Sequence, residues 1–409
     1  MSKPLTPQLR FKGFTDEWKQ AKVKEVFTLG NGYTPSKANP DFWNNGTIPW
    51  FRMEDIRENG RVLSDSIQHV TPQAVKSSGL FPAGSFIVST TATIGEHALL
   101  IADSLANQRF TVFQTVNRWS WLKANYLLYR FFGLGEWCRR NVNAGGLAAV
   151  NISDLEKYDI DFPDSEKERE SIASFFSSLD KLISDTAKEV ERLDKMKIAS
   201  LQKMFPRPGS TTPEIRFKGF EGEWNIRKIG TLFSEGNQRG CSGLPLSVSL
   251  VRGVYPTEDF IKTVTVKDFS NYKVVDDGDI VYNSMRMWQG ASGVSYWNGF
   301  VSPAYTVLKP IAEKHLCSEF FAYLFKLDWV IKIFEQNSQG LTKDTWNLKY
   351  PAISAIELPI PPDSKEQFYI AHYFRNLDAL IAAKRQKLAK LRNIKASCLD
   401  KMFVNFATL

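Results

Sequence analysis

Side chains that commonly bind metals, carry redox chemistry or act as nucleophiles are few in this chain and widely spaced. The four cysteines and four histidines are Cys138, Cys241, Cys317, Cys398, His69, His97, His315 and His372. No CxxC pair and no HExxH pair occurs, so a structural zinc site, a disulfide framework and a metalloprotease site find no support. We expect the histidines to be surface or hydrogen-bonded core residues, and we expect no metal in this chain.

Nucleotide-binding and methyl-transfer motifs are also missing. The sequence contains no GxxxxGK[ST] loop and no GxGxxG fingerprint. The pair Pro361-Pro362 follows Ile360, whereas the catalytic motif of an amino-methyltransferase needs Asn or Asp at that position. A Ser-His-Asp triad stays open from sequence, but no nucleophile elbow supports one. These patterns point to recognition instead of catalysis, so we expect a chain that is not itself an enzyme and holds no cofactor.

The composition is that of an ordinary globular protein with a mildly basic charge. The chain has 409 residues, 43% hydrophobic and 23% charged, which is enough for two or three domains. Its 52 basic and 44 acidic side chains give a net charge of +8, which permits a nucleic-acid or acidic partner without proving one. We find no apolar signal segment and no run of about 18 apolar residues, and scattered cysteines suit a reducing compartment. We therefore expect a cytoplasmic protein without membrane contact.

Two internal repeats determine the organisation. The segment PQLRFKGFTDEW from Pro7 returns 206 residues later as PEIRFKGFEGEW from Pro213. Further along, the pattern P…KE…IA…F…LD from Pro163 returns 198 residues later from Pro361. Because the known solenoid repeats are only about 20–50 residues long, this spacing indicates a duplicated domain. We predict an α+β fold with a pseudo-two-fold internal repeat, each copy being a globular region followed by a long helix.

The two globular regions share only a coarse order of elements. Alternating and β-branched residues predict strands in both. The predicted strands are Ser85–Thr90, His97–Ile101 and Arg109–Thr115 in the first region, and Asp279–Ser284, Gly293–Trp297 and Ala304–Lys309 in the second. A helix is expected to follow in each, over Leu122–Arg140 and Ser318–Asn337. One fold with two different surfaces suits a protein whose halves recognise different things.

Both long helices have a predicted start and an apolar seam. Ser165 with Glu168, and Ser364 with Gln367, have the spacing of capping boxes, so the first turns are expected to differ by one residue. Apolar residues then follow at steps of four and three, which predicts coiled-coil packing. The seam residues are Ile172, Phe176, Leu179, Ile183, Val190, Leu193 and Met204, and then Ile370, Phe374, Leu377, Ile381, Leu388, Leu391 and Met402.

Polar residues interrupt the two seams at the same steps. These are Thr186 and Lys384, and then Lys197 and Lys395. Polar seam residues can fix register, so we expect the helices to pack on each other antiparallel, with one globular region at each end. About 39 residues of helix would span roughly 58 Å. The alternative is two separate surface helices.

The positive charge is concentrated on the second long helix. Residues Glu166–Lys203 contain eight basic and eight acidic side chains, whereas Lys365–Lys401 contain nine basic and three acidic ones. The simpler interpretation is a solvated face, or a face that pairs with an acidic partner. The alternative is contact with a phosphate backbone.

The motifs, taken in order along nearly the whole chain, resemble the specificity (S) subunit of a Type I restriction–modification enzyme. The first globular region carries segments similar to the family's in the family's order: GYTPSK from Gly32, GTIPW from Gly46, TIG from Thr93 and NQR from Asn107. The second carries YNSMRMWQG from Tyr282 and VSPAY from Val301, similar to another branch of the same domain. Both helix starts are similar to the family's P…EQ…IA…LD pattern, although Glu168-Arg169 departs from its usual Glu-Gln.

This resemblance implies a mechanism. Residues 1–160 and 207–360 would be two target-recognition domains, each reading one half of a bipartite sequence in double-stranded DNA. Residues 161–206 and 361–409 would be the helices that set the spacer between the half-sites and dock two modification (M) subunits. Those subunits carry the adenine methyltransferase chemistry with S-adenosylmethionine, and restriction (R) subunits that use ATP and Mg²⁺ can join. This chain would choose the site, and its partners would perform the reaction.

Candidate base-reading residues are those whose side chains can make paired hydrogen bonds to base edges or lie in the motif loops. The first set is Lys37, Arg52, Thr91, Thr93, Gln108 and Arg109. The second set is Gln238, Arg239, Arg252, Arg286, Gln289, Gln339 and Lys343. Each could instead be a surface charge or a group that stabilises a loop. We expect Trp50, Trp288 and Trp346 to be core residues or loop anchors.

Two other functions remain as alternatives at this point. One is a non-enzymatic scaffold that binds nucleic acid without sequence preference, through the basic second helix. Its binding would depend steeply on salt and barely on sequence. The other is a stand-alone nuclease or methyltransferase, which the missing motifs disfavour.

Overall fold

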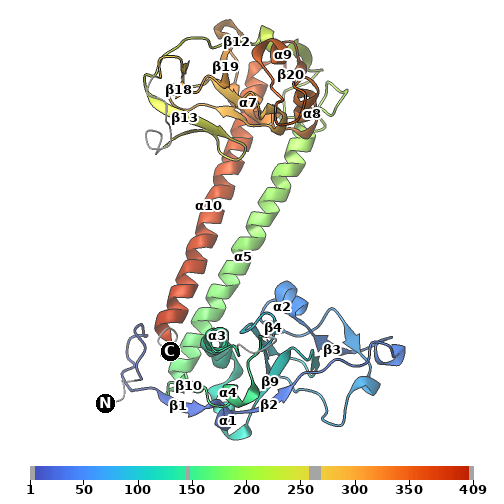
Figure 1. The fold of residues 1–409 in the computed structure, drawn as a ribbon, viewed down its shortest axis with the longest axis vertical. Coiled ribbons are helices and arrows are strands. Elements are labelled where there is room, and N and C mark those ends of the chain that lie inside the picture. Colours follow the sequence, from blue (N-terminus) through green and yellow to red (C-terminus); the bar gives the residue numbers. More distant parts are fainter. Residues whose placement is uncertain (1–4, 144–147, 258–268, 405–409) are drawn as a thin grey trace. The chain divides into compact units, whose positions relative to one another are not determined.

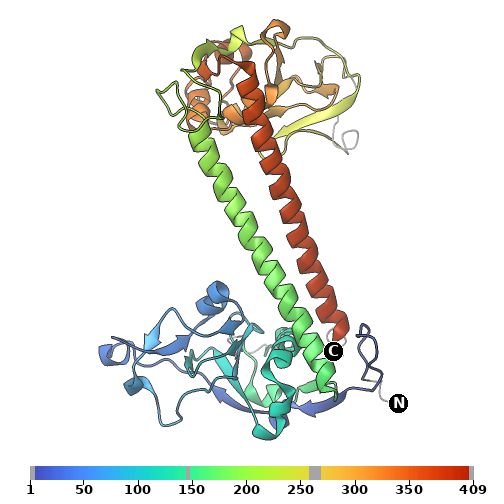
Figure 2. The same ribbon diagram turned by 180° about the vertical axis from the view of Figure 1, so that it is seen from behind.

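The computed structural model describes residues 5–143, 148–257 and 269–404, and the chain divides into two compact units. Unit 1 combines Met1–Thr186 with Lys387–Leu409, and unit 2 is Ala187–Gln386. Two long helices, α5 (Glu166–Met204) and α10 (Ser364–Met402), each contribute to both units (Figures 1 and 2). Strands and helices are mixed in each unit, which confirms the α+β class. Within these residues, no helix is long and apolar enough to cross a membrane.

Unit 1 is built on a five-stranded sheet in which every pair is antiparallel except β4 with β7. In pairing order its strands are β2 (Phe27–Asn31), β9 (Phe110–Thr115), β6 (Phe86–Ser89), β7 (His97–Leu100) and β4 (Val62–Leu63). A three-stranded sheet has the order β5 (His69–Val70), β3 (Ile48–Phe51), β8 (Leu105–Ala106). The predicted strands correspond to β6, β7 and β9 and the predicted helix to α3 (Ala124–Arg140), so these predictions are confirmed.

A cluster of phenylalanine rings joins α3 to the larger sheet. Phe131 of α3 stacks on Phe86 of β6 with ring centroids 4.5 Å apart. The same ring meets Phe113 and Phe27 edge-on, at 5.3 and 5.5 Å. Strands β6 and β7 are buried along their whole length, in keeping with their continuous apolar runs. The helix therefore covers one face of the sheet whose strands lead into the motif loops.

His97 of β7 is a buried core residue, as expected from the sequence. Its side chain is 1% exposed, and Nε2 lies 3.1 Å from the carbonyl oxygen of Leu128 in α3. The ring meets Phe132 edge-on with centroids 4.7 Å apart. Burial lowers the pKa of His97 to about 3, with a smaller contribution from nearby Arg61. The imidazole is therefore neutral in the folded protein at neutral pH.

Acidification is expected to destabilise unit 1 through His97. Because the folded pKa is below the unfolded value of about 6.5, the unfolded chain takes up a proton first, and stability is lost as pH falls below about 6.5. We expect the wild type to lose up to about 3 kcal/mol more than His97→Gln between pH 7 and pH 4. Denaturant unfolding of both proteins across this range measures the difference. Parallel curves for the two proteins would contradict a neutral, buried His97.

Unit 2 contains two four-stranded sheets. One has the order β12 (Phe233–Glu235), β19 (Tyr305–Pro310), β16 (Ile280–Asn283), β17 (Ser292–Val294). The other has the order β14 (Gly253–Pro256), β13 (Leu244–Ser249), β18 (Gly299–Val301), β15 (Lys273–Val275). Strands β16 and β19 confirm two predictions. The strand predicted over Gly293–Trp297 is wrong beyond Val294, because the Ser295 hydroxyl donates to the Trp297 carbonyl at 2.7 Å in a turn.

The single helix predicted over Ser318–Asn337 is also wrong. The chain forms α7 (Ser318–Leu324) and α8 (Asp328–Gln336), and Leu327 between them is extended, with φ −70° and ψ 135°. A continuous helix cannot pass through that conformation. The break lets Phe325 and Leu327 both enter the core of unit 2, where they are 0% and 8% exposed.

The two long helices pack against each other within each unit, as the seam predicts. In unit 2, Lys384 pairs with Glu189 at 2.8 Å and Lys197 with Asp378 at 2.5 Å. Residue numbers rise along α5 as they fall along α10, so the two segments are antiparallel. In unit 1, Lys395 pairs with Asp180. The three seam lysines are therefore ion-paired across the helix pair.

The repeated Asp180 and Asp378 also join each helix pair to its globular region. The Tyr129 hydroxyl of α3 donates to Asp180 at 3.2 Å, and the Tyr323 hydroxyl of α7 donates to Asp378 at 2.9 Å. Each carboxylate thus accepts from a tyrosine of its own globular region and pairs with a lysine of the other long helix. These contacts explain why Leu-Asp recurs at the same step of both helices.

The repeated RFKGF segments clamp the helix ends. In unit 1, Arg10 binds Glu168 of α5 with two hydrogen bonds of 2.6 and 2.8 Å, and the N–H of Leu9 donates to the Lys401 carbonyl of α10 at 2.8 Å. In unit 2, Arg216 binds Glu366 at 2.8 and 2.7 Å, and the N–H of Ile215 donates to the Lys203 carbonyl at 2.9 Å. Each segment therefore ties the start of one long helix to the end of the other.

The helix starts follow the capping predictions in part. The Glu168 N–H donates to the Ser165 hydroxyl at 3.4 Å, as predicted for the first helix, but the Glu168 carboxylate binds Arg10 instead of completing the box. The second prediction is wrong, because Ser364 lies inside α10 and Asp363 accepts from the N–H of Lys365 at 2.8 Å. Glu166 and Ser364, the first residues of α5 and α10, are 198 residues apart, which is the offset of the repeat. The two helices therefore begin at equivalent positions, and the predicted difference of one residue is wrong.

Candidate nucleic-acid interface

Four loops of unit 1 surround a cavity of about 380 Å³. They follow β2, connect β3 to α2 (Met53–Asn59), connect β6 to β7, and precede β9. Five of the six residues predicted in the first region line this cavity: Lys37, Arg52, Thr93, Gln108 and Arg109. Thr91 is not among the lining residues, and its carbonyl accepts from the Ser89 hydroxyl at 2.8 Å. Residues far apart in the sequence therefore meet where the sequence predicts a site.

A buried tryptophan supports the basic side of the cavity. Trp50 is 1% exposed, and its Nε1–H donates to the Tyr33 carbonyl at 3.0 Å, which confirms it as a core residue. The Lys37 ammonium lies 5.8 Å from the Trp50 ring and the Arg52 guanidinium 5.6 Å from it. Cation–π contacts of this kind hold charged groups on a fixed platform. Both cations are thereby held near the Trp50 ring at the cavity.

The loop positions are set by close backbone approach. The N–H of Tyr33 donates to the Ala106 carbonyl at 2.7 Å. A Cβ atom at Gly32 would lie 2.2 Å from the Asn107 carbonyl oxygen, so only glycine fits there. In the same place the Asn107 side chain accepts from the N–H of Arg109 at 2.9 Å. These contacts fix the loop that carries Gln108 and Arg109 against the loop that carries Lys37.

Arg52 is held at the start of α2 by a buried carboxylate. The N–H of Arg52 donates to Asp55 at 2.6 Å, and Asp55 also accepts from the N–H of Ile67 at 2.7 Å. Asp55 is 0% exposed. This arrangement fixes the backbone of Arg52 while its side chain stays at the cavity.

Sequence reasoning missed Arg57, which also lines this cavity. It lies on α2 and borders a neighbouring cavity of about 620 Å³, together with Arg61 and Arg139. Among the residues described, no ion pair involves Arg57, Lys37 or Arg109. No pattern in the sequence singles out Arg57, because it is a lone arginine on a short helix. Four cations and one carboxylate, Glu54, line the first cavity, so its charge suits a polyanion.

In unit 2, two loops meet through a pair of tryptophans. The rings of Trp288 and Trp346 meet edge-on with centroids 5.5 Å apart, and the Lys343 ammonium lies 5.5 and 5.4 Å from them. Trp288 also donates to the Met285 carbonyl at 3.1 Å, so both tryptophans are loop anchors as expected. The structure brings four predicted residues to this pair of loops: Arg286, Gln289, Gln339 and Lys343.

Arg252 lies on the turn between β13 and β14, which is tethered to the same place. Lys326 donates to the carbonyls of Leu250, at 3.2 Å, and of Gly290. Burial lowers the pKa of Lys326 to about 8. The Arg252 guanidinium stacks on Tyr255 at 4.0 Å. Arg252 is therefore connected to the loop that carries Gln289.

Gln238 and Arg239 are placed elsewhere in unit 2. Their backbone pairs with β15, where the N–H of Val274 donates to the Gln238 carbonyl at 2.9 Å. Arg239 donates to the Asn271 carbonyl at 2.9 Å. Strand β15 forms the opposite edge of its sheet from β14, so the described contacts do not bring these two residues to the tryptophan loops.

The described residues contain no candidate metal site, because no three of their His, Cys, Asp or Glu side chains are grouped so that they could hold an ion. The sites are instead made of basic and amide side chains on loops supported by aromatic rings. Such groups recognise the phosphates and base edges of nucleic acids.

Comparison with known proteins gives the class to which this geometry belongs. The family model "Type I restriction modification DNA specificity domain" matches twice, over residues 15–193 and 223–393. The chain therefore belongs to this family, whose members are the non-catalytic specificity subunits of Type I restriction–modification systems. The resemblance stated from the sequence is confirmed, and the sequence-independent scaffold gains no support.

Two relatives and one solved structure show how far the similarity extends. The EcoprrI specificity subunit of Escherichia coli is 45% identical over 162 residues, 39% of this chain and 40% of that relative's length. The MjaIX specificity subunit of Methanocaldococcus jannaschii is 24% identical over 94% of this chain and 92% of its own. The crystal structure of the Type I restriction–modification S subunit from M. genitalium has a TM-score of 0.62 at 14% identity, covering 97% of this chain and 99% of that one. This likeness supports the fold alone.

Proposed function

We propose that this chain selects the DNA target of a Type I restriction–modification system by reading a bipartite sequence with its two globular regions, residues 1–160 and 207–360. The observation that carries the proposal is the convergence of five predicted side chains on one basic cavity in unit 1. Membership of a DNA-specificity family supports double-stranded DNA as the partner of that cavity. The loops of unit 2 around Trp288 and Trp346 would read the other half.

Within each region, the side chains divide by chemistry. Arginine and glutamine can make paired hydrogen bonds to guanine and adenine, so Gln108 and Arg109 would read bases in the first region. Arg286 and Gln289 would do so in the second. Lys37 and Arg57 suit phosphate contacts, because a phosphate needs charge more than paired geometry.

Single substitutions of the base readers test this division. We expect Arg109→Ala and Arg286→Ala each to relax the choice at one base pair, by about 1–3 kcal/mol, in different half-sites. Lys24→Ala and Lys228→Ala are matched controls, because these exposed lysines lie outside the proposed loops. Competitive binding of the assembled S–M complex to a library of duplexes measures the effect. Unchanged selectivity in either arginine variant would remove that residue from the site.

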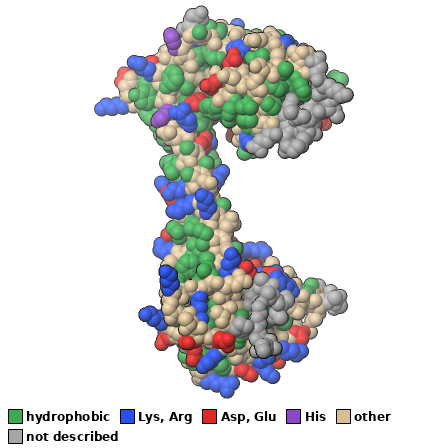
Figure 3. All heavy atoms as spheres, turned by 90° about the vertical axis from the view of Figure 1, so that its left-hand side faces the viewer, with side chains coloured by type: hydrophobic (Ala, Val, Ile, Leu, Met, Phe, Trp, Pro, Cys, Tyr) green, Lys and Arg blue, Asp and Glu red, His purple; other side chains and the backbone are tan. Residues whose placement is uncertain are grey.

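The two long helices carry repeated apolar side chains on one flank of the pair. In unit 1 these are Leu182 and Ile394, 41% and 48% exposed; in unit 2 they are Met196 and Leu380, 37% and 43% exposed. Each precedes a seam residue by one position, which places all four on corresponding flanks. The other flank of unit 2 is charged, with Arg385 paired to Asp194 at 2.8 Å. Hydrophobic patches among Lys and Arg side chains are visible over α10 in Figure 3.

Two equivalent patches suit two copies of one partner. Leu182 and Leu380 are 198 residues apart, as are Met196 and Ile394, so the duplication reproduces the patch. Exposed apolar patches of this kind mark interaction sites. Two modification subunits are the proposed occupants, one on each unit, and the helices would set the spacer between the half-sites. S-adenosylmethionine would be bound by those subunits, and ATP and Mg²⁺ by restriction subunits, with no cofactor in this chain.

Mapping of methylated adenines tests the function directly. The host genome is sequenced for base modification with and without this gene. Loss of one bipartite motif, and of no other, is the expected result, and it gives both half-sites and the spacer together. A methylation pattern that is unchanged although the modification subunit is present and active would contradict the proposal.

A further inference from the structure

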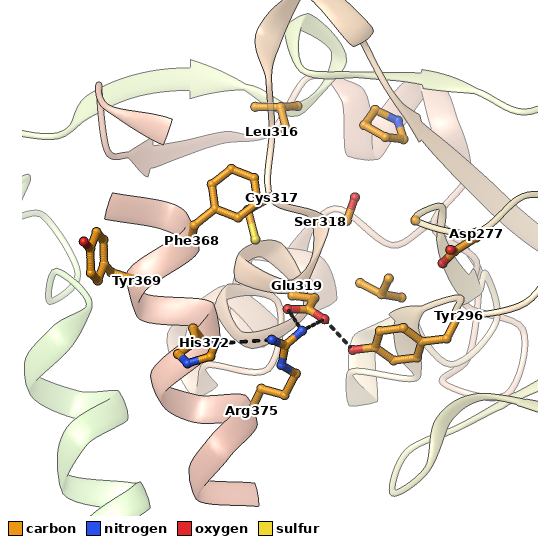
Figure 4. A pocket seen from close by; sticks show the side chains of 13 residues that line it. Asp277, Tyr296, Leu316, Cys317, Ser318, Glu319, Phe368, Tyr369, His372 and Arg375 are labelled. Carbon is orange, nitrogen blue, oxygen red and sulfur yellow. Dashed lines mark hydrogen bonds and ion pairs between the residues drawn. The ribbon is translucent and has the colours of Figure 1, made fainter. Parts of the chain in front are cut away.

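A cavity of about 710 Å³ opens on unit 2 between α7, the first turns of α10 and the end of β17 (Figure 4). Its hydrophobic lining includes Val294, Leu316 and Phe368, and Phe368 projects from α10 towards Cys317. Three aromatic side chains at this cavity are largely exposed: Tyr296 at 55%, Phe368 at 53% and Tyr369 at 56%. So much aromatic surface in one place marks a binding site more often than a plain surface.

Two charged side chains of this cavity, Arg375 and Glu319, already have partners in the chain, whereas the Asp277 that also lines it has a described hydrogen bond only through its backbone N–H, to Asn298. Arg375 pairs with Glu319 at 3.1 Å, and the Tyr296 hydroxyl donates to the same carboxylate at 3.0 Å. His372 Nδ1 lies 3.2 Å from Arg375 on the other side (Figure 4). The ion pair needs no ligand to neutralise it, and it fixes one wall. The hydrophobic side chains of the lining, next to this fixed wall, suit a hydrophobic group.

The duplication shows that the fold does not require these side chains. The positions 198 residues earlier on α5 hold Glu170, Ser171, Ser174 and Ser177 in place of Phe368, Tyr369, His372 and Arg375. Both copies keep the arginine that binds the glutamate at the start of the long helix, and both keep the aspartate, Asp180 or Asp378, that accepts from a tyrosine of the globular region. At these positions, one glutamate and three serines of the first copy are replaced by exposed aromatic and basic side chains in the second. The aromatic cavity is thus a property of the second copy.

The cavity is continuous with the apolar flank of the helix pair in unit 2. The ring of Tyr369 lies 5.6 Å from that of Phe217, and Phe217 lies 6.2 Å from Tyr373. Tyr373 is two turns before Leu380 on the same flank of α10. The Tyr373 hydroxyl is 2.9 Å from that of Ser200, which holds it against α5. A partner seated on Leu380 and Met196 would therefore reach the cavity.

We propose that this cavity receives an aromatic or aliphatic side chain of the modification subunit that docks on unit 2. The inference rests on the proposed function, and it adds that the two docking sites are unequal. The site on unit 1 has the helix patch alone, whereas the site on unit 2 has the patch and the anchor cavity. The first modification subunit consequently binds to unit 2, and the second binds more weakly to unit 1.

Stepwise binding of the modification subunit to the full chain tests this order. Native mass spectrometry of a titration without DNA gives the dissociation constants of the first and second steps. The variant Phe368→Glu/Tyr369→Ser carries the residues of the first copy, and both side chains are exposed, so the core is left intact. It should weaken the first step about 10- to 100-fold and leave the second unchanged. The control Glu170→Gln/Ser171→Ala, on α5, should change neither step.

A photo-crosslinker gives an independent measurement of the order. With p-benzoylphenylalanine at position 368, a crosslink to the modification subunit should already form when one modification subunit is present per chain. A crosslink that forms only when the modification subunit is in more than one-to-one ratio to this chain would overturn the proposal. Equal dissociation constants for the two binding steps of the wild type would also overturn it, as would an unchanged first dissociation constant in the variant. Dimers of the free chain that Phe368→Glu/Tyr369→Ser abolishes would assign the cavity to a second copy and also overturn it. Failure of the wild type to bind any modification subunit would instead overturn the proposed function.

Discussion

Exchange of residues 15–155 for the matching segment of a family member with another target is expected to change one half of the recognised sequence and to leave the other half unaltered. The exchanged segment contains Lys37, Arg52, Gln108 and Arg109, whereas Arg10 and the two long helices, α5 and α10, lie outside it. Each mismatched base pair costs about 1–3 kcal/mol, so a half-site of several base pairs changes affinity by orders of magnitude. Methylation mapping of the reconstituted hybrid system measures both half-sites at once.

The reciprocal exchange within unit 2 is the matched control for this experiment. It should alter the other half-site alone, and the hybrid with both exchanges should have a wholly new target at the same spacer. Physical independence of the two regions is expected because each unit has its own aromatic core and its own clamp. A hybrid in which one exchange altered both halves would contradict separate reading.

Much of the fold could be predicted because the signal was duplicated. A heptad seam of one helix is a weak indication, but the same seam 198 residues later, with polar breaks at the same steps, indicates a shared packing partner. Strands β6, β7 and β9 were predictable because short continuous or alternating apolar runs are typical of buried strands. The helix break at Leu327 was not predictable, because no Gly or Pro lies at residues 325–327. The conformation there is set by the burial of Phe325 and Leu327 in the core of unit 2.

The candidate site was predictable where motif loops carry it and unpredictable where tertiary contacts create it. Loops that begin at strand ends brought Lys37, Arg52 and Arg109 together, because the sheet order of unit 1 places these ends side by side. Arg57 was missed because a lone arginine on a short helix has no pattern. Gln238 and Arg239 were assigned to the second site from residue type alone, and the backbone of that stretch pairs instead with β15.

Removal of either arginine clamp is expected to cost about 3–5 kcal/mol of stability in the unit concerned. Glu168 and Glu366 are each 1% exposed, so Arg10→Met or Arg216→Met leaves a buried carboxylate without its cation. The two variants should differ. Glu168 also accepts from the Trp18 indole at 3.3 Å, whereas the Trp224 indole N–H has no partner within the described structure. Arg216→Met should therefore be the more destabilising of the two.

The pH dependence of these variants separates a lost charge pair from a lost packing contact. A carboxylate left buried without a cation has a raised pKa, since burial disfavours its charged form. Protonation would relieve the penalty, so Arg216→Met should be closer to wild-type stability at pH 5 than at pH 8. The double variant Arg216→Met/Glu366→Gln should recover most of the loss at both pH values, because no buried charge remains. Denaturant unfolding at the two pH values measures this, and an equal loss at both would mean that packing of the arginine side chain, not its charge, holds the helix ends together.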